Sequence, residues 1–103
     1  MALSQIPAWE SDIALSLQGP LHELPKKVVN FLLKFDGEGN VFATEHIRRY
    51  ESILRLFNVI YEDVACKLFP FTFEGKASLW FYFLPLNLIS SWLEFKNVVT
   101  NSF

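Results

Sequence analysis

The sequence predicts an all-α domain, a compact bundle of about four core helices preceded by a largely extended N-terminal segment. Three observations lead to this prediction. Apolar residues recur at helical spacing in four stretches, Gly and Pro separate these stretches, and a Ser-x-x-Glu capping box opens the last one. The expected helices span roughly residues 44–58, 61–70, 75–84 and 91–103. Apolar residues make up 51% of the 103 positions, which is enough for one core.

The N-terminal part of the chain differs from the rest in its prolines. Pro7, Pro20 and Pro25 each fix φ and remove a backbone donor, so they interrupt regular structure. A short helix is expected near residues 12–18, and a helix of that length must dock on another element to be stable. Residues 1–19 are therefore expected to form an N-terminal extension.

Residues 29–35 lead into the bundle. Phe31, Leu33 and Phe35 fall at alternate positions, which is the period of an extended segment with one buried face. Residues 36–40 contain two glycines between Asp and Asn, and this composition predicts a loop.

The first core helix is expected over residues 44–58, with Thr44 as its N-terminal cap. His46 lies near its start and is expected at the surface or at its boundary. The residues that share the expected buried face are Ala43, Ile47, Tyr50, Leu54 and Phe57. The residues of the expected polar face are Arg48, Ser52 and Arg55.

The second helix is expected over residues 61–70, because Glu62 and Asp63 suit a first turn and Pro70 should end it. Its apolar stripe consists of Val64, Ala65, Leu68 and Phe69. Three Phe residues at alternate positions, Phe69, Phe71 and Phe73, are expected to lie between helices.

The third helix is expected over residues 75–84, between Gly75 and Pro85. One face is expected to carry Phe73, Ala77, Trp80 and Leu84. Residues 81–83 are all aromatic and make this helix apolar nearly all round. A helix of this kind is either central in the fold or partly covered by another molecule.

The fourth helix is expected over residues 91–103, opened by the capping box of Ser91 and Glu94. Its apolar face consists of Trp92, Phe95, Val99 and Phe103. We expect the stripes around Trp80 and Trp92 to bury against one another.

The sequence contains no pattern that predicts an enzyme, a cofactor site or a metal site. His22, His46 and Cys66 have unrelated spacings, whereas a zinc site needs about four ligands close together. Cys66 is expected to be a buried apolar residue, and a lone thiol without a disulfide partner indicates an intracellular, cytoplasmic chain. A net charge of -2 predicts no direct nucleic-acid site. The longest apolar run, residues 79–86, is too short for a membrane span, and no small-molecule substrate is expected.

One ordered set of motifs carries a resemblance to a known family. Residues 62–85, EDVACKLFPFTFEGKASLWFYFLP, are followed by ISSWLEF at residues 89–95. Together they resemble the gag domain of plant gypsy-type LTR retrotransposons, whose pattern runs L-F-P-x-[ST]-[LF]-x-G-x-A-x-x-W, L-P and I-[ST]-[ST]-W-x-x-F. Upstream, PLHELP at residues 20–25, KFDG at 34–37 and EHI at 45–47 are also similar to it. The resemblance covers residues 20–103.

The resemblance implies a capsid N-terminal-like domain, a structural unit without catalytic residues that associates with copies of itself or with other Gag chains. It implies that Gly75 and Ala77 permit close helix contact, and that a core around Trp80, Leu84, Trp92 and Phe95 positions outer faces for assembly. The residues that match the family motif are Phe35, Gly37, Ile47, Leu68, Phe69, Pro70, Gly75, Ala77, Trp80, Leu84, Pro85, Trp92 and Phe95.

Some family features are missing from the sequence, namely a zinc knuckle, a protease Asp-[ST]-Gly motif and the second half of a capsid. The chain is therefore expected to be a fragment, a decayed copy or a piece retained by a host. Two alternatives to self-association stay open. One is an adaptor that binds a partner peptide in a groove between residues 29–35 and the helices, and the other is a genomic relic that folds poorly.

Overall fold

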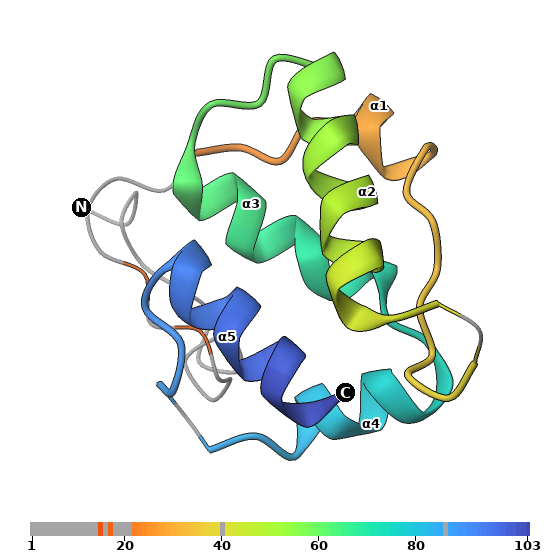
Figure 1. The fold of residues 1–103 in the computed structure, drawn as a ribbon. Coiled ribbons are helices and arrows are strands. Elements are labelled where there is room, and N and C mark those ends of the chain that lie inside the picture. The colour runs from red at the N-terminus through yellow and green to blue at the C-terminus, as the bar shows by residue number, and fades with distance from the viewer. Residues whose placement is uncertain (1–14, 16, 18–21, 40, 86) are drawn as a thin grey trace.

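The computed structural model describes residues 15, 17, 22–39, 41–85 and 87–103, and this part of the chain is mostly helical (Figure 1). The expected helix near residues 12–18 lies outside the described residues. The helices are α1 (Lys26–Val29), α2 (Ala43–Leu56), α3 (Glu62–Leu68), the 3-10 helix η3 (Phe69–Thr72), α4 (Gly75–Tyr82) and α5 (Trp92–Ser102). The predicted all-α class and its four core helices are confirmed.

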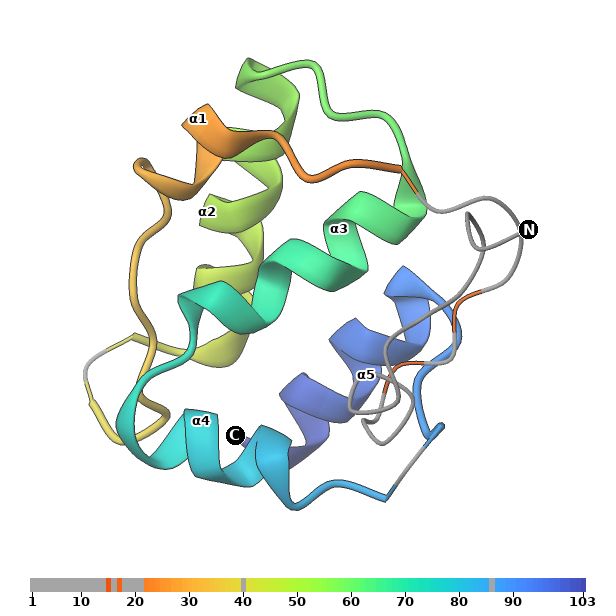
Figure 2. The same cartoon turned by 180° about the vertical axis from the view of Figure 1, so that it is seen from behind.

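Three helices make the central layer of the molecule. α2 and α3 each pack against α5, and α4 lies across the end of α5 (Figures 1 and 2). Two isolated parallel β-bridges join connecting segments to one another, one between Leu15 and Ile89 and one between Phe35 and Phe73. Within the residues that the structure describes, every helix falls short of the length or apolar character that a membrane span requires.

The segment before the loop differs in part from the extended segment that the sequence predicts. α1 occupies residues 26–29, starts after Pro25 and buries Val28. The prediction of one buried face was wrong, because Phe31 and Leu33 are exposed and only Phe35 is buried. The turn after α1 interrupts the alternation of buried and exposed side chains. Of the three residues, only Phe35 forms a β-bridge, and its partner is Phe73.

α2 confirms the predicted amphipathic pattern. Four of the five residues on its expected inner face are buried and the fifth, Phe57, is half-buried, while the three residues of the expected polar face are exposed. The predicted cap was wrong. The carbonyl of Phe42 accepts a hydrogen bond from the His46 amide at 3.0 Å, so Phe42 is the N-cap and Thr44 lies inside the first turn.

α3 changes into η3 at the proline that the sequence analysis identified as a stop. Pro70 has no amide hydrogen, so the α-helical pattern ends at Leu68 and a single 3-10 turn follows. Residues three apart share a face of a 3-10 helix, which places Phe69 and Thr72 inside. Phe71 is exposed, so its expected position between helices was wrong.

α5 begins at a capped N-terminus, as predicted. The Ser91 hydroxyl accepts a hydrogen bond from the Glu94 amide at 3.1 Å. The Glu94 carboxylate reaches one residue further back than in a standard capping box, and it accepts bonds from the Ser90 amide at 2.8 Å and the Ser90 hydroxyl at 2.6 Å. These bonds lower the pKa of Glu94.

Candidate functional site

The residues that match the family motif mostly build the core. Phe35, Ile47, Leu68, Phe69, Ala77 and Phe95 are buried. Pro70, Trp80, Leu84 and Trp92 are half-buried, Gly37 lies at the surface boundary, and Gly75 and Pro85 are exposed. Most of the motif therefore specifies packing and backbone conformation.

Phe69 is the centre of an aromatic cluster. It is fully buried where α3 becomes η3, and its ring lies 4.7–5.4 Å from five neighbouring rings. Those neighbours come from α2, the segment after η3, and α5, and they are His46, Tyr50, Phe73, Trp92 and Phe95. Packing of this kind joins the helices through edge-to-face and tilted contacts.

The stripes around Trp80 and Trp92 pack against one another, through Trp80 with Phe103 and Phe73 with Phe95, but the two indoles themselves lie at opposite ends of α5. Trp92 starts α5 and packs on Tyr50 and Phe69, whereas Trp80 packs on Phe103, just beyond the last turn of α5, and on Phe73. The expected packing of the two stripes is therefore confirmed. The rings of the central cluster separate the two indoles.

The backbone conformation and the close packing at position 37 both require a glycine. The φ of Gly37 is +79°, and a Cβ added there would lie 2.4 Å from Cε1 of Phe103. The ring of Phe103 thus covers the backbone of the loop and packs edge-on against Phe35, with ring centroids 5.4 Å apart. This contact joins the last residue of the chain to the loop before α2.

Gly75 has a different role from the one that the resemblance implies. It is exposed, a Cβ there would meet only Asp36 Cβ at 3.7 Å, and its φ is +53°. Gly75 therefore serves the backbone turn into α4 and not a close helix contact. Ala77 does permit a close approach, because it is fully buried and its amide donates to the Asp36 carbonyl at 3.0 Å.

His46 is buried, contrary to the sequence-based expectation of a surface position. The Thr72 hydroxyl donates to the Phe69 carbonyl at 2.7 Å, so it accepts from His46 Nε2 at 2.8 Å. The imidazole is stacked on Phe35 and on Phe69. Burial and the nearby Arg49 charge lower the pKa of His46 from 6.5 to about 4, so His46 is a neutral packing residue at neutral pH.

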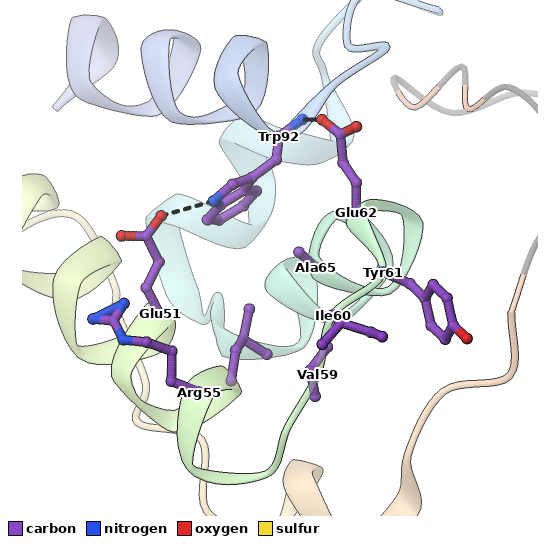
Figure 3. A pocket seen from close by; sticks show the side chains of 9 residues that line it. Glu51, Arg55, Val59, Ile60, Tyr61, Glu62, Ala65 and Trp92 are labelled. Atoms are coloured by element: carbon purple, nitrogen blue, oxygen red, sulfur yellow. Dashed lines mark hydrogen bonds between the residues drawn. The ribbon is translucent and has the colours of Figure 1, made fainter.

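Trp92 joins the N-terminus of α5 to both other central helices (Figure 3). Its indole Nε1 donates to Glu51 Oε2 on α2 at 2.8 Å, and its amide donates to Glu62 Oε2 on α3 at 2.7 Å. Lys96 donates to the same Glu51 oxygen at 3.0 Å. Burial raises the pKa of Glu51, but the bonds from Trp92 and Lys96 and the charges of Lys96 and Arg55 outweigh it and leave that pKa below its usual value.

An open groove lies below this contact, between the end of α2, the loop over residues 57–61 and the start of α3 (Figure 3). Its volume is about 400 Å³. Apolar side chains and the Trp92 indole form much of its lining, with carboxylates on the rim and Ile60 and Tyr61 at the edge. The lining residues are Glu51, Leu54, Arg55, Val59, Ile60, Tyr61, Glu62, Ala65 and Trp92. We call it the α2–α3 groove.

A second apolar surface lies on α4, which the sequence analysis expected to be central or covered. α4 is peripheral, and Leu79, Tyr82 and Phe83 are 61%, 79% and 75% exposed. They fall at i, i+3 and i+4, so they form one continuous stripe along the helix and its C-cap. We call it the α4 stripe. Neighbouring exposed side chains of this size mark contact surfaces more often than isolated ones do.

A third cluster has the residue types of a hydrolase triad without its geometry. His22 Nδ1 lies 2.9 Å from Asp63 Oδ1, the His22 amide donates to Asp63 Oδ2 at 2.6 Å, and Ser90 lines the same cavity. A triad requires the Ser hydroxyl to donate to the His ring. The Ser90 hydroxyl donates to Glu94 instead. The cluster therefore holds the segment before α1 on α3 and gives Ser90 no activating base.

The other side chains that could act as a nucleophile or as metal ligands are not arranged to do so in the part of the chain that the structure describes. Cys66 is fully buried, and burial, followed by the Glu62 and Asp63 charges, raises the pKa of its thiol to about 12. In the described ranges, no group of three or more His, Cys, Asp or Glu side chains is arranged to hold a metal ion. The predicted burial of Cys66 is confirmed.

Several residues that form the groove could not be identified from the sequence. Glu51 and Ile60 lie outside the apolar stripes and the motifs that the sequence contains. Glu51 follows Tyr50 on the inner edge of α2, which is a weak sign that it could reach a neighbouring helix. No local signal identifies Ile60, because the groove forms only when three elements meet.

The chain matches no family model, no curated protein and no solved structure.

Proposed function

We propose that this chain is a structural module that works by associating with copies of itself, a capsid-type unit of the Gag protein of a plant gypsy-type LTR retrotransposon. The ordered motif in residues 20–103 supports the family assignment. Copies of the same chain or other Gag chains are its partners, the cytoplasm is its location, and it carries out no catalysis itself. In this proposal the motif residues form the scaffold and the exposed faces make the contacts.

The observation that carries the proposal is the α4 stripe. Three large apolar side chains, each more than half exposed, lie together on one helix. Exposing them to water is unfavourable, at roughly 25 cal/mol per Å² of apolar surface. Covering the stripe with protein recovers that free energy, which gives a physical reason for association.

Size-exclusion chromatography with light scattering over a concentration series tests the proposal. The single chain has a mass of 12.0 kDa, and we expect the weight-average mass to rise above this value as concentration increases. The variant Leu79→Gln is expected to weaken the rise. A mass that stays at one chain up to millimolar concentration would exclude self-association.

A second candidate is the adaptor that binds a peptide beside residues 29–35. Phe31 and Leu33 are exposed, and a cavity of about 240 Å³ lies next to Lys34 and Phe35. A pull-down with the wild-type chain and with Phe31→Asp tests it. Equal recovery of the same partner by both forms would argue against binding at this segment.

A further inference from the structure

Residues 22–34 form a strap that runs from the start of α3 past the end of α2 to η3 (Figure 2). Only Val28 is buried in this strap, and its one helix, α1, has four residues. The turn after α1 is closed by hydrogen bonds within the strap, such as that from the Phe31 amide to the Val28 carbonyl at 2.9 Å. Segments with few buried side chains and exposed backbone are those that open locally while the rest of a protein stays folded.

The hydrogen bonds between the strap and the rest of the described chain lie at its two ends. At one end, the Asp63 carboxylate accepts from the His22 amide at 2.6 Å, and its other oxygen lies 2.9 Å from His22 Nδ1. At the other end, Lys34 Nζ donates to the Phe71 carbonyl at 2.8 Å. The Lys34 bond is exposed to water, whereas Asp63 is only 8% exposed. The contact at Asp63 is therefore the stronger of the two.

The start of α3 holds His22 by its ring as well as by its hydrogen bonds. The imidazole is stacked on Tyr61, with ring centroids 3.5 Å apart and planes that differ by 7°. Asp63 lies in the first turn of α3, where the helix dipole favours a negative charge. Burial raises the pKa of Asp63, but the bonds from His22 and its charge outweigh this effect and leave that pKa below its usual value. The ionised carboxylate is therefore the form that binds the strap.

The chain is anchored independently on both sides of the strap. Phe35, the next residue, is buried and forms a β-bridge with Phe73, and upstream Leu15 forms one with the fully buried Ile89. The aromatic cluster around Phe69, which joins the central helices, is built from residues outside the strap. The strap can therefore lift without detaching from the molecule and without loosening the central helices.

We propose that residues 22–34 open and close as one unit, and that His22 and Asp63 form the latch that holds this strap shut. In the open state Val28 leaves the core and Asp63 loses both bonds to His22, while α2, α3 and α5 keep their packing. Opening uncovers the apolar site that Val28 fills in the closed state. This conformational switch is independent of the proposed self-association.

Two variants weaken the latch from its two sides. His22→Ala removes the ring that stacks on Tyr61 and the bond of Nδ1, and Asp63→Asn removes the charge that both bonds use. Glu23→Ala is the matched control, because Glu23 is exposed and lies next to His22 in the same strap. His22 is partly exposed, so His22→Ala is expected to fold, as helical circular dichroism and a cooperative melt will verify.

Amide hydrogen exchange of the full chain, followed by NMR at several low urea concentrations, measures the opening directly. The chain is kept at a concentration where light scattering gives the mass of one copy. We expect the amides of His22 and Phe31 to share one protection factor, at least about tenfold below that of Tyr50 in α2 and insensitive to low urea. His22→Ala and Asp63→Asn are each expected to lower the protection of Phe31 by roughly a further tenfold, and Glu23→Ala to leave it unchanged.

Three results would overturn the strap and its latch. Equal protection and equal urea dependence at Phe31 and Tyr50 would show that the strap unfolds only with the whole chain. Different protection at His22 and Phe31 would show that the segment frays at separate points and does not open as one unit. If neither latch variant lowers the protection of Phe31, or if Glu23→Ala lowers it as much, His22 and Asp63 do not form the latch. Self-association stands or fails separately, by the concentration series.

Discussion

The loop at Gly37 and the ring of Phe103 depend on each other. Gly37→Ala is expected to lower the free energy of unfolding by about 1–3 kcal/mol, because it adds a Cβ at a φ of +79° and against the Phe103 ring. Gly39→Ala is the matched control. Its Cβ would meet nothing closer than Asp36 Oδ1 at 3.6 Å, so its effect should be small. Urea unfolding measures both, and equal losses in the two variants would contradict this account.

His46 makes the stability of the fold depend on pH. Its pKa is about 4 in the folded chain and 6.5 when unfolded, so the unfolded chain binds the proton more tightly. The stability that neutral His46 provides is complete above about pH 6.5 and is lost as the pH falls toward 4. Between about pH 7 and pH 5 we expect a loss of about 2 kcal/mol in the free energy of unfolding.

His46→Gln is the control for this effect. Gln can still donate a hydrogen bond to Thr72, but it has no proton to gain in this pH range. Urea unfolding at several pH values is expected to show a flatter dependence between pH 7 and pH 5 than in the wild type. The same slope in both proteins would show that His46 is not its source.

At the scale of elements, α5 depends on its cap. Ser91→Ala removes the side chain that accepts from the Glu94 amide, and we expect a loss of about 1 kcal/mol in the free energy of unfolding. Ser52→Ala is the matched control, because the Ser52 hydroxyl only donates back to the Arg48 carbonyl within α2. Thermal melts compare the two, and a loss in Ser52→Ala as large as that in Ser91→Ala would contradict a specific role of the cap.

The helices that could be predicted from the sequence contain local signals of helix formation, namely a periodic apolar stripe or a capping residue. α2 repeats its apolar residues over four turns, and α5 has both a stripe and a capping serine. α1 has four residues, which is too few for a periodic pattern, and the exposure of Phe71 depends on a 3-10 turn that Pro70 permits but does not specify. Local pattern therefore predicts long helices and fails for short turns.

At the scale of the whole molecule, contacts between residues far apart in the sequence determine the features that could not be predicted from it. His46 is buried because Thr72, 26 residues away, gives its Nε2 a partner. Trp92 reaches Glu51, 41 residues away, and in doing so forms one wall of the groove. The apolar character of the α4 segment could be predicted, but its exposure could not, because that depends on α4 lying at the edge of the central layer.

Amide NMR spectra of the full chain, recorded from micromolar to millimolar concentration, test the central claim of self-association most directly. The account predicts that the signals of Leu79, Tyr82 and Phe83 shift progressively as concentration rises. Signals on the outer face of α2, such as those of Arg48 and Ser52, should stay in place. Spectra that are identical over the whole range would contradict it.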